Sequence, residues 1–582
     1  MYYRVEKSGC VFEEESYRVR IDGKSVVKKR KKCIGKMGEN NEIIPNAYYS
    51  ERLAKEELER KLAEISAELK GEAVSSKREK ETKKIVSKRK KEGLSYAISC
   101  ILDNLGIKDS LLSQFGEEKA KLLISTIQYL IATECGAVDD FCYFDAECTH
   151  EYGSDISSPA FSRLFASVSE CDINSFFKKL QIANSRREGA ERGVPYYASF
   201  DSTAFSSYSE GIDLVEASKG KQDPDLDHFA LAAIYNSKTN NCGYYRLYRG
   251  NIPDVSTVRD LVKVLASMGY SFAKRLLFDR GYGSITNIFL VHKELGSDIM
   301  VMLKSRTSIY TKAIESAGIA FKNDSACYIP GQEVYATSVV EDIKVTDEDK
   351  REYDIHAHVH VYYSPERYSK ECENLEAEID FEIERVSSLL RSKEVSIDSV
   401  LVKAAIKSSL RKCIKVTKTS NRTVVLSKDP EEVNRRLSKA GYFCILTTEL
   451  LDAKTTLFIY RGRDGVERLF NIVKNALGFT RANVKNDDTL QGKVFCVMLS
   501  GMVINFIKNC LKENRQVFTR KLTYNKLRKE LEGIYSYNLK GKKNFCEISD
   551  RQKLILEKLG IEVPFLGTEV KTKRITKKKR KD

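Results

Sequence analysis

The order of hydrophobic segments after Val194 restricts the fold more than any other feature of this 582-residue chain. Residues 194–207 have the composition of a β-strand. Six further segments follow. Four have the pattern of strands, at 228–237, 243–250, 272–281 and 298–303, and two have the pattern of helices, at 254–269 and 284–296. Helices that alternate with hydrophobic strands pack against the faces of one sheet. The order β-β-β-α-β-α-β therefore predicts an α/β core.

This order is that of the RNase H-like fold, whose central sheet places the first and fourth strands side by side. Asp201 lies inside the first predicted strand, and Asp279 lies near the end of the fourth. A carboxylate among apolar neighbours requires a partner or a counter-ion, because unpaired burial of a charge is costly. If the two strands are neighbours, the two acids converge, and their like charges favour a divalent cation.

The stretch YRGRDGVERLFNIVK, residues 460–474, carries a third carboxylate on a predicted helix. At 100° per residue, four polar side chains fall within about 40° of Glu467 on one face. These are Tyr460, Arg463, Glu467 and Lys474. Leu469, Ile472 and Val473 lie off this face and are predicted to be buried. Taken alone, the face could be a solvated ion-pair stripe, because Arg463 and Glu467 have the i,i+4 spacing of such pairs.

A catalytic interpretation gives each of these residues a role. Glu467 would complete a set of three oxygen donors that suits Mg²⁺ or Mn²⁺, and two such ions would activate a water or a 3′-hydroxyl in phosphodiester chemistry. Lys474 lies about 10 Å from Glu467 along the helix, which suits a neighbouring phosphate rather than the metals. Arg463 can bind a phosphate through two parallel hydrogen bonds, and Tyr460 can stack or hydrogen-bond.

These residues resemble the signature of a known family. The chain looks like a DDE transposase of bacterial insertion sequences, in the group with a Tyr-x2-Arg-x3-Glu-x6-Lys motif, and it matches that spacing at all four positions. The blocks FDSTAFS, YRGNIPD and FDRGY match the family's other motifs in the right order. One departure is Asp464, where many members have tryptophan, and the chain contains no tryptophan at all. A mechanism that uses this indole, such as release of flanking DNA through a hairpin, is therefore not implied.

The resemblance implies a cut-and-paste transposase that cleaves DNA at element ends and joins them to target DNA. It implies Asp201, Asp279 and Glu467 as catalytic metal ligands, and Tyr460, Arg463 and Lys474 as DNA contacts. The partners would be double-stranded terminal repeats and target DNA, bound by a homodimer. Two alternatives stay open: an RNase H-like nuclease without strand transfer, and a non-catalytic, domesticated DNA-binding protein. The chain lacks the phosphate-binding loop of ATP-dependent phosphotransfer enzymes.

The charge of the chain also favours a polyanionic partner. The net charge is +16, and basic residues concentrate at 28–32, 77–91 and 571–582. We expect six regions: a basic β-rich element, helix and connector (1–93), a helical, DNA-binding region (94–190), the first part of an RNase H-like core (194–304), an inserted α+β domain (305–445), the second part of the core with the Glu467 helix (446–515), and a C-terminal region with a basic tail (516–582).

Other features point to a reduced, non-membrane environment. The apolar runs 122–132 and 494–507 are shorter than a membrane span and are predicted to be core helices. The scattered cysteines indicate reduced thiols and a cytoplasmic location, associated with the nucleoid through DNA. A zinc site at Cys142, Cys148 and His150 is disfavoured by its irregular spacing and the lack of an evident fourth ligand. The three histidines of 356–360 are better explained as a solvated strand face.

Overall fold

The computed structural model divides the chain into two compact units, Met1–Ile85 and Val86–Asp582. It describes residues 2–5, 8–21, 24–38, 43–47, 49–50, 52, 89–134, 137–187, 197–209, 211–217, 226–237, 239–252, 254–268, 275–346, 351–391, 399–418, 424–518, 522–539 and 542–564. Most of the helix predicted from residue 50 to 69, most of the basic connector that follows it, and the basic C-terminal tail lie outside the described residues.

The N-terminal unit is the β-rich element expected from the sequence. Its strands β1 (Tyr2–Val5), β2 (Cys10–Ile21), β3 (Lys24–Met37) and β4 (Ile43–Pro45) form one antiparallel sheet in chain order. A small apolar cluster of Val11, Ile34 and Tyr49 is buried against it. Gly35 allows β3 and β4 to approach closely, because a Cβ atom there would come within 2.2 Å of the Ile44 carbonyl oxygen.

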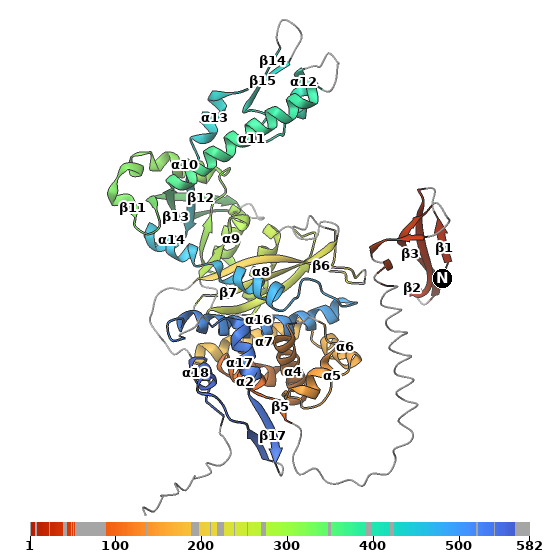
Figure 1. The fold of residues 1–582 in the computed structure, drawn as a ribbon. Helices are drawn as coiled ribbons and strands as arrows, with labels where there is room; N and C mark the ends of the chain where they lie inside the picture. Colours follow the sequence, from red (N-terminus) through yellow and green to blue (C-terminus); the bar gives the residue numbers. More distant parts are fainter. Residues whose placement is uncertain are drawn as a thin grey trace, which may run out of the picture. The chain divides into compact units, whose positions relative to one another are not determined.

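The helical region consists of α2 (Gly93–Asn104), α3 (Ile107–Phe115), α4 (Glu117–Thr133), α5 (Phe141–Glu147), α6 (Ser158–Ala166) and α7 (Glu170–Arg187). These helices pack around the 27-residue α16 (Asp487–Glu513), which runs between them and the sheet (Figure 1). Asn486 caps α16 by accepting a hydrogen bond from the Thr489 backbone, and two aspartates follow in its first turn.

Helix α16 is apolar on nearly all sides because it has protein on nearly all sides. It contacts α4 and α6 on one side and β8 (Asn241–Arg249) on the other. By length and composition alone α16 could cross a membrane, but 72% of its most apolar window is buried inside the protein. The prediction that both apolar runs are core helices is confirmed, since α4 and α16 are largely buried.

The main sheet has nine strands, and its first five follow the predicted order. Strands β6 (Ala198–Ser207), β7 (Asp227–Asn236) and β8 pair antiparallel as neighbours. After α8 (Asp254–Met268), strand β9 (Arg275–Phe278) pairs parallel with β6, and after α9 (Ile285–Glu294), strand β10 (Asp298–Met302) pairs parallel with β9. The prediction that the first and fourth strands are neighbours is confirmed.

The segment predicted as an inserted domain partly continues this same sheet. Strand β16 (Tyr442–Thr447) pairs with β10, and β13 (Glu352–Tyr363), β12 (Val334–Thr346) and β11 (Tyr328–Ile329) follow in order outward. A second part has its own apolar cluster. It is built from α11 (Pro365–Arg391), α12 (Ser399–Ala405), α13 (Pro430–Leu437) and the hairpin β14 (Ile414–Lys418) and β15 (Val424–Lys428). Helix α10 (Ser308–Ala317) lies against β12 and β13.

The C-terminal elements return to the start of the helical region. Strand β17 (Tyr535–Leu539) pairs with β18 (Lys542–Phe545) and with β5 (Lys90–Lys91), and α17 (Tyr524–Glu532) lies against α2. Helix α18 (Asp550–Lys558) follows. The buried Glu92 carboxylate accepts hydrogen bonds from Ser536 and Thr149 and forms an ion pair with Lys543.

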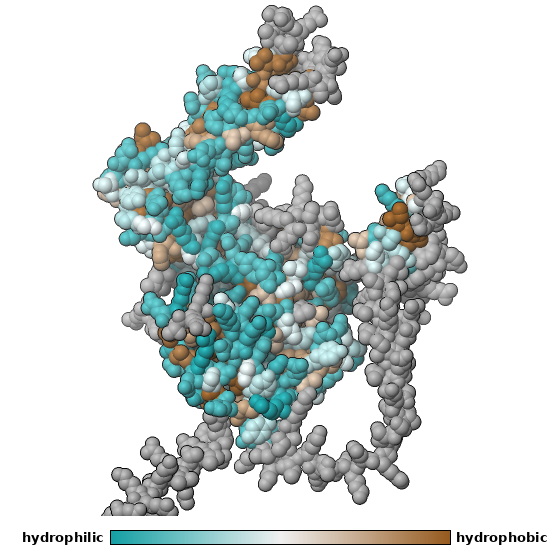
Figure 2. Space-filling view, in the orientation of Figure 1, coloured by the Kyte–Doolittle hydropathy of each residue, from teal (hydrophilic) through white to brown (hydrophobic). Residues whose placement is uncertain are grey.

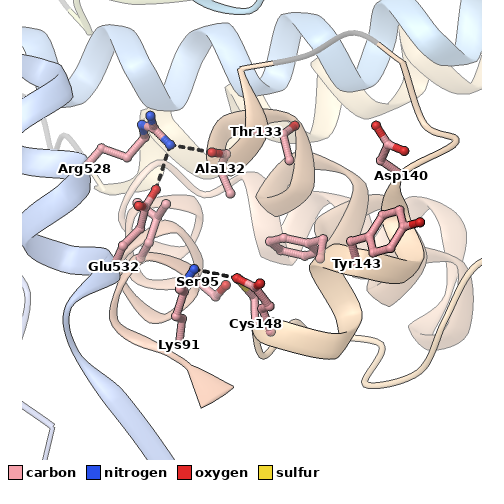
Figure 3. Close-up of a pocket in the computed structure, with 12 residues that line it drawn as sticks. Lys91, Ser95, Ala132, Thr133, Asp140, Tyr143, Cys148, Arg528 and Glu532 are labelled. Atoms are coloured by element: carbon pink, nitrogen blue, oxygen red, sulfur yellow. Dashed lines mark hydrogen bonds and ion pairs between the residues drawn. The ribbon is translucent and has the colours of Figure 1, made fainter. Parts of the chain in front are cut away.

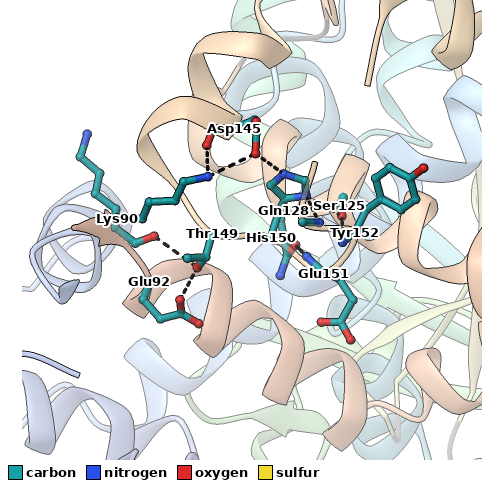
Figure 4. A network of polar contacts seen from close by, with 11 residues as sticks. Lys90, Glu92, Ser125, Gln128, Asp145, Thr149, His150, Glu151 and Tyr152 are labelled. Atoms are coloured by element: carbon teal, nitrogen blue, oxygen red, sulfur yellow. Dashed lines mark hydrogen bonds and ion pairs between the residues drawn. The ribbon is translucent and has the colours of Figure 1, made fainter. Parts of the chain in front are cut away.

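His150, one of the three residues of the disfavoured zinc site, forms polar contacts close to Glu92 (Figure 4). The His150 ring lies 3.0 Å from both a carboxylate oxygen of Asp145 and the hydroxyl of Ser125. Lys90 also contacts Asp145, through the backbone carbonyl at 2.5 Å. His150 is therefore part of a hydrogen-bonded network that joins α4, α5 and β5.

Close packing of α16 against α6 provides a test of this architecture. A Cβ atom at Gly492 would lie 2.2 Å from the Phe165 carbonyl oxygen. Gly492→Ala should therefore lower the free energy of unfolding by about 1–3 kcal/mol, although alanine alone favours a helix. Thermal denaturation measures this. Gly281→Ala is the matched control, because a Cβ atom there meets nothing within 4 Å. Equal melting temperatures for the two variants would contradict the packing.

Candidate active site

Strand pairing places the two predicted aspartates side by side. In the parallel pair of β6 and β9, Phe200 lies opposite Phe278, and the next residue on each strand is an aspartate. Asp201 is still within β6 and is half-buried, whereas Asp279 directly follows β9. Residues at the same level of two paired strands project from the same face of the sheet, so the two aspartates are neighbours on that face. The convergence expected from the sequence is therefore present in the backbone register.

A short turn after β9 fixes the second acid. The 3₁₀ turn η2 (Arg280–Tyr282) brings the Tyr282 hydroxyl to the hydroxyl of Ser202, where it donates a hydrogen bond of 2.7 Å. The Tyr282 ring also packs edge-on against Phe200, with centroids 5.0 Å apart. Sequence reasoning did not assign a role to Tyr282 or Ser202. Both residues lie in the sequence blocks that contain the aspartates, Ser202 in FDSTAFS and Tyr282 in FDRGY.

The segment 460–474 is not one continuous helix, so the prediction of one helical face is wrong. The low helix propensity of Gly462 and Gly465 does indicate that Tyr460 precedes the Glu467 helix, and this is what the structure shows. Tyr460 belongs to α14 (Ala453–Arg461), while Glu467 belongs to α15 (Asp464–Asn471). Gly462 and Arg463 separate the two helices, and the glycine's low helix propensity favours a break there. Lys474 lies in a π-helical turn, η5 (Ile472–Ala476), where the 100° spacing no longer holds. The predicted common face was therefore calculated on a helix that the chain does not form.

Helix α15 nevertheless presents Glu467 as expected. It packs against β6, β7 and β8, and the predicted buried residues Leu469, Ile472 and Val473 are each at most 3% exposed. Gly465 is required for this approach, since a Cβ atom would lie 2.3 Å from the Tyr235 ring. The Glu467 side chain points away from this contact and remains 55% exposed.

Arg463 binds the strand acid more closely than the helix acid. Its guanidinium donates to an Asp279 carboxylate oxygen at 2.6 Å, whereas its nearest approach to Glu467 is 4.0 Å. The buried Tyr460 hydroxyl donates to the same Asp279 oxygen at 3.2 Å and also contacts Arg463. The Arg463–Glu467 pair, which a solvated ion-pair stripe would require, is therefore the weaker of the two contacts of Arg463. Tyr460 and Arg463 instead connect the α14–α15 junction to the end of β9.

Asp201 forms no ion pair with the residues that the structure describes. Burial, together with the nearby carboxylates of Asp279 and Glu467, raises the pKa of Asp201 to about 6. The Ser202 backbone N–H, which donates to Asp201 at 2.8 Å, and the charge of Arg463 oppose this shift. The charges of Asp279 and Glu467 are thus among the causes of the raised pKa of Asp201.

Lys474 lies at a different level of the sheet. Its ammonium group is 5.0 Å from the centre of the Phe205 ring, four residues beyond Asp201 on β6. Four residues of strand correspond to about 13 Å. Burial lowers the pKa of Lys474. Asp464, at the position where tryptophan was expected, forms an exposed ion pair with Arg468 at 3.2 Å.

The donor set fits a divalent cation by its chemistry. Asp201, Asp279 and Glu467 offer carboxylate oxygens, the ligands that hard divalent cations prefer. Burial, and to a smaller extent the charges of Asp279 and Glu467, raise the pKa of Asp201, and a bound cation would favour its charged form. Among the described residues, however, no three acidic, histidine or cysteine side chains form a preassembled metal site. Arg463 holds Asp279 at the place where a cation would compete for it.

A separate cavity lies in the helical region, away from these acids. It has a volume of about 450 Å³ and is lined by residues of α2, α4, α5 and α17, including Ser95, Tyr143 and Cys148 (Figure 3). Its charged side chains largely neutralise one another, since Lys91 pairs with Glu147 and Arg528 with Glu532. None of the three carboxylates of the candidate site is part of its lining.

Comparisons with known proteins are consistent with this geometry. A family model described as "Transposase DDE domain" matches residues 198–501, a range that contains all six predicted site residues. A cryo-EM structure of a piggyBac transposase in a synaptic complex with hairpin DNA is 10% identical in sequence. The match covers 76% of this chain and 76% of that chain, with a TM-score of 0.32, which is too low to support an argument. No curated protein matches the chain.

The pKa of Asp201 predicts how the stability of the metal-free protein depends on pH. The folded-state pKa of about 6 exceeds the ordinary value of about 3.9, so protonation of Asp201 stabilises the fold below about pH 4, and this contribution is lost as the pH rises through 6. In EDTA, Asp201→Asn should therefore gain stability relative to wild type between pH 4 and pH 8, by about 1–3 kcal/mol.

Thermal denaturation across this pH range, with and without Mg²⁺, measures the effect. Mg²⁺ at pH 8 should raise the melting temperature of the wild type more than that of Asp201→Asn. Asp464→Asn, which removes an exposed carboxylate on α15, should behave as the wild type. If the melting temperatures of wild type and Asp201→Asn changed with pH in the same way, the pKa of Asp201 would not be raised in the folded protein.

Proposed function

The chain belongs to the family of transposases with a DDE domain, and from this premise we propose that it is a cut-and-paste DNA transposase acting through Asp201, Asp279 and Glu467. The observation that carries the proposal is the β6–β9 register, which sets two aspartates side by side while Glu467 lies close enough to raise the pKa of one of them. The strand order also supports an RNase H-like core.

The three carboxylates would hold divalent cations, as members of the family generally do, and we propose Mg²⁺ or Mn²⁺ in two positions. Such ions supply activation of a water or 3′-hydroxyl and charge stabilisation at the leaving oxygen. The chain's own residues position the ligands. The Tyr282–Ser202 hydrogen bond holds the turn after Asp279, and the close contact of Gly465 with Tyr235 sets the depth of Glu467 over the sheet.

We propose a second role for Arg463, because its partner in this structure, Asp279, is a proposed metal ligand. In this structure it neutralises Asp279 at 2.6 Å. If Asp279 were a metal ligand, the Arg463 guanidinium would be available to bind a DNA phosphate through two parallel hydrogen bonds. Tyr460, which lies under the guanidinium with its ring centre 4.6 Å from Cζ, would limit how far Arg463 can move. Lys474 would contact a phosphate further along β6.

Other features of this proposal rest on the resemblance alone. They include a bacterial insertion sequence as the source, terminal inverted repeats as the specific DNA, a homodimer in the DNA complex, and a cytoplasmic location. Inverted repeats flanking the coding region would identify the DNA ends and provide the substrate for the assays below. Cleavage without joining would favour the alternative of a nuclease that lacks strand transfer.

Glu467→Gln tests the catalytic role of the helix acid. It should reduce cleavage and strand transfer by several kcal/mol of barrier, roughly 10³-fold or more, because it removes a metal ligand without changing side-chain size. The assay uses labelled element ends and a plasmid target, with cleavage and joining scored separately. Asp464→Asn, one turn earlier on the same helix, should retain activity. DNA binding should be preserved in both, and near-normal cleavage by Glu467→Gln would remove this residue from the site.

Arg463→Lys and Lys474→Ala test the phosphate contacts. Each should reduce end cleavage by roughly 10- to 150-fold, the equivalent of losing a charge-assisted contact of about 1.5–3 kcal/mol in the transition state. Lysine cannot reproduce the two-point contact of arginine. Non-specific nicking in Mn²⁺ should decrease less, because the carboxylates remain. Unchanged end cleavage in both variants would mean that these cations serve only the protein's own charge balance.

A further inference from the structure

A second large cleft begins beside the candidate active site. It has a volume of about 840 Å³ and is lined by twenty residues, of which seven are arginine or lysine and three are glutamate. One wall comes from the core of the protein, after β9 and β10, and the other comes from α11, α13 and the segment before β14. The excess of positive charge suits an anionic occupant that is long enough to touch both walls.

The core wall of this cleft is continuous with the catalytic acids. Arg280 directly follows Asp279 in the chain, and its guanidinium donates to the Ser305 hydroxyl at 3.2 Å. Arg306 is exposed in the turn after β10, the strand that pairs parallel with β9. Because β9 and β10 run in the same direction, both arginines lie at the edge of the sheet where Asp279 ends β9.

The opposite wall carries two kinds of cation. Arg367 and Arg435 are fixed by acids on their own helices, in ion pairs of 2.7 Å with Glu371 and 2.5 Å with Glu432. Arg436 donates to the backbone carbonyl of Ser409 at 2.9 Å, a contact that leaves its charge uncompensated. The charges of Arg367 and Arg435 are thus balanced by the protein, while Arg436 contributes a positive charge to the cleft.

Five of the seven lining cations form no ion pair among the described residues. Arg280, Arg436 and Lys439 donate only to neutral groups, and Arg306 and Lys412 form no ion pair or hydrogen bond within the described part of the chain. The charge of Lys412 nevertheless contributes to the lowered pKa of Glu432. Serine hydroxyls lie between these cations, at Ser305, Ser408 and Ser409. Arginine, lysine and serine side chains are the groups that proteins use to contact the phosphate backbone of DNA.

We propose that this cleft holds the phosphate backbone of double-stranded DNA next to the bond that the three carboxylates attack. This rests on the proposed transposase function and assigns the α11–α13 region as a second wall for the substrate. The sheet supports this arrangement, because β16 and β13 join that region to β10 through continuous strand pairing. Figure 2 shows largely hydrophilic surface along α11, with apolar residues gathered toward the end that carries β14 and β15.

The test is a double variant, Arg306→Gln with Lys412→Gln, compared with Lys344→Gln plus Lys403→Gln. The control pair removes two exposed cations that do not line the cleft. Binding of a fluorescent DNA duplex is measured by anisotropy in EDTA over a range of salt concentrations. The cleft variant should bind roughly 10- to 100-fold more weakly, and its log–log salt dependence should become shallower by about 1–2, since each phosphate contact contributes about 0.9.

Every outcome of this comparison decides the proposal. The control pair should leave both affinity and salt dependence near wild type, and matching melting temperatures should show that both double variants are folded. Equal effects of the two double variants, or no effect of the cleft variant, would overturn it, as would a loss confined to single-stranded DNA. Because no metal is present, the result is independent of cleavage. Normal cleavage by Glu467→Gln would reject the proposed catalytic site while leaving the cleft intact.

Discussion

The parallel pairing of β6 with β9 is the constraint on which the candidate site depends. These strands are separated by two antiparallel strands and a helix in the sequence, yet Phe200 and Phe278 lie opposite each other, so that Asp201 and Asp279 become neighbours. A slip of one residue would turn one aspartate to the other face of the sheet, because side chains alternate along a strand. The aromatic contact between Phe200 and Phe278, with ring centres 5.7 Å apart, favours this register from the core.

The third carboxylate depends on packing rather than on pairing. Helix α15 approaches the sheet only because Gly465 leaves space for the Tyr235 ring, and its apolar side is covered by α16. Helix α16 in turn needs the helical region on its other side, where Gly492 meets the backbone of Phe165. The helical region therefore supports the site indirectly. It packs on one side of α16, and α16 packs against α15, the helix that carries Glu467.

Charge balance connects the site with the cleft beside it. Arg463 and Tyr460 hold Asp279, while the half-buried Asp201 has a raised pKa and forms no ion pair with the described residues. Beyond Asp279 the sign of the charge reverses, because Arg280 and Arg306 follow and form no ion pair with the described residues. In the proposed function, the three carboxylates would bind divalent cations and the neighbouring arginines would bind phosphates. This is the arrangement that metal-dependent chemistry on a DNA backbone requires.

The order of elements and the buried side of the Glu467 segment can be predicted from the sequence, because hydrophobic periodicity and helix–strand alternation are local properties. The pairing of the Asp201 strand with the Asp279 strand follows only from the match of that order to the RNase H-like topology, since periodicity does not show which strands are neighbours. The low helix propensity of Gly462 indicates that Tyr460 precedes the Glu467 helix. The sequence does not reveal that Tyr460 belongs to a helix of its own, or that Lys474 lies in a π turn, since tertiary contacts fix the backbone there. It also did not reveal that β16, β13 and β12 extend the core sheet, or that Arg463 pairs with Asp279 rather than Glu467. These features join residues far apart in the chain, and only the folded structure decides which of several possible partners comes within reach.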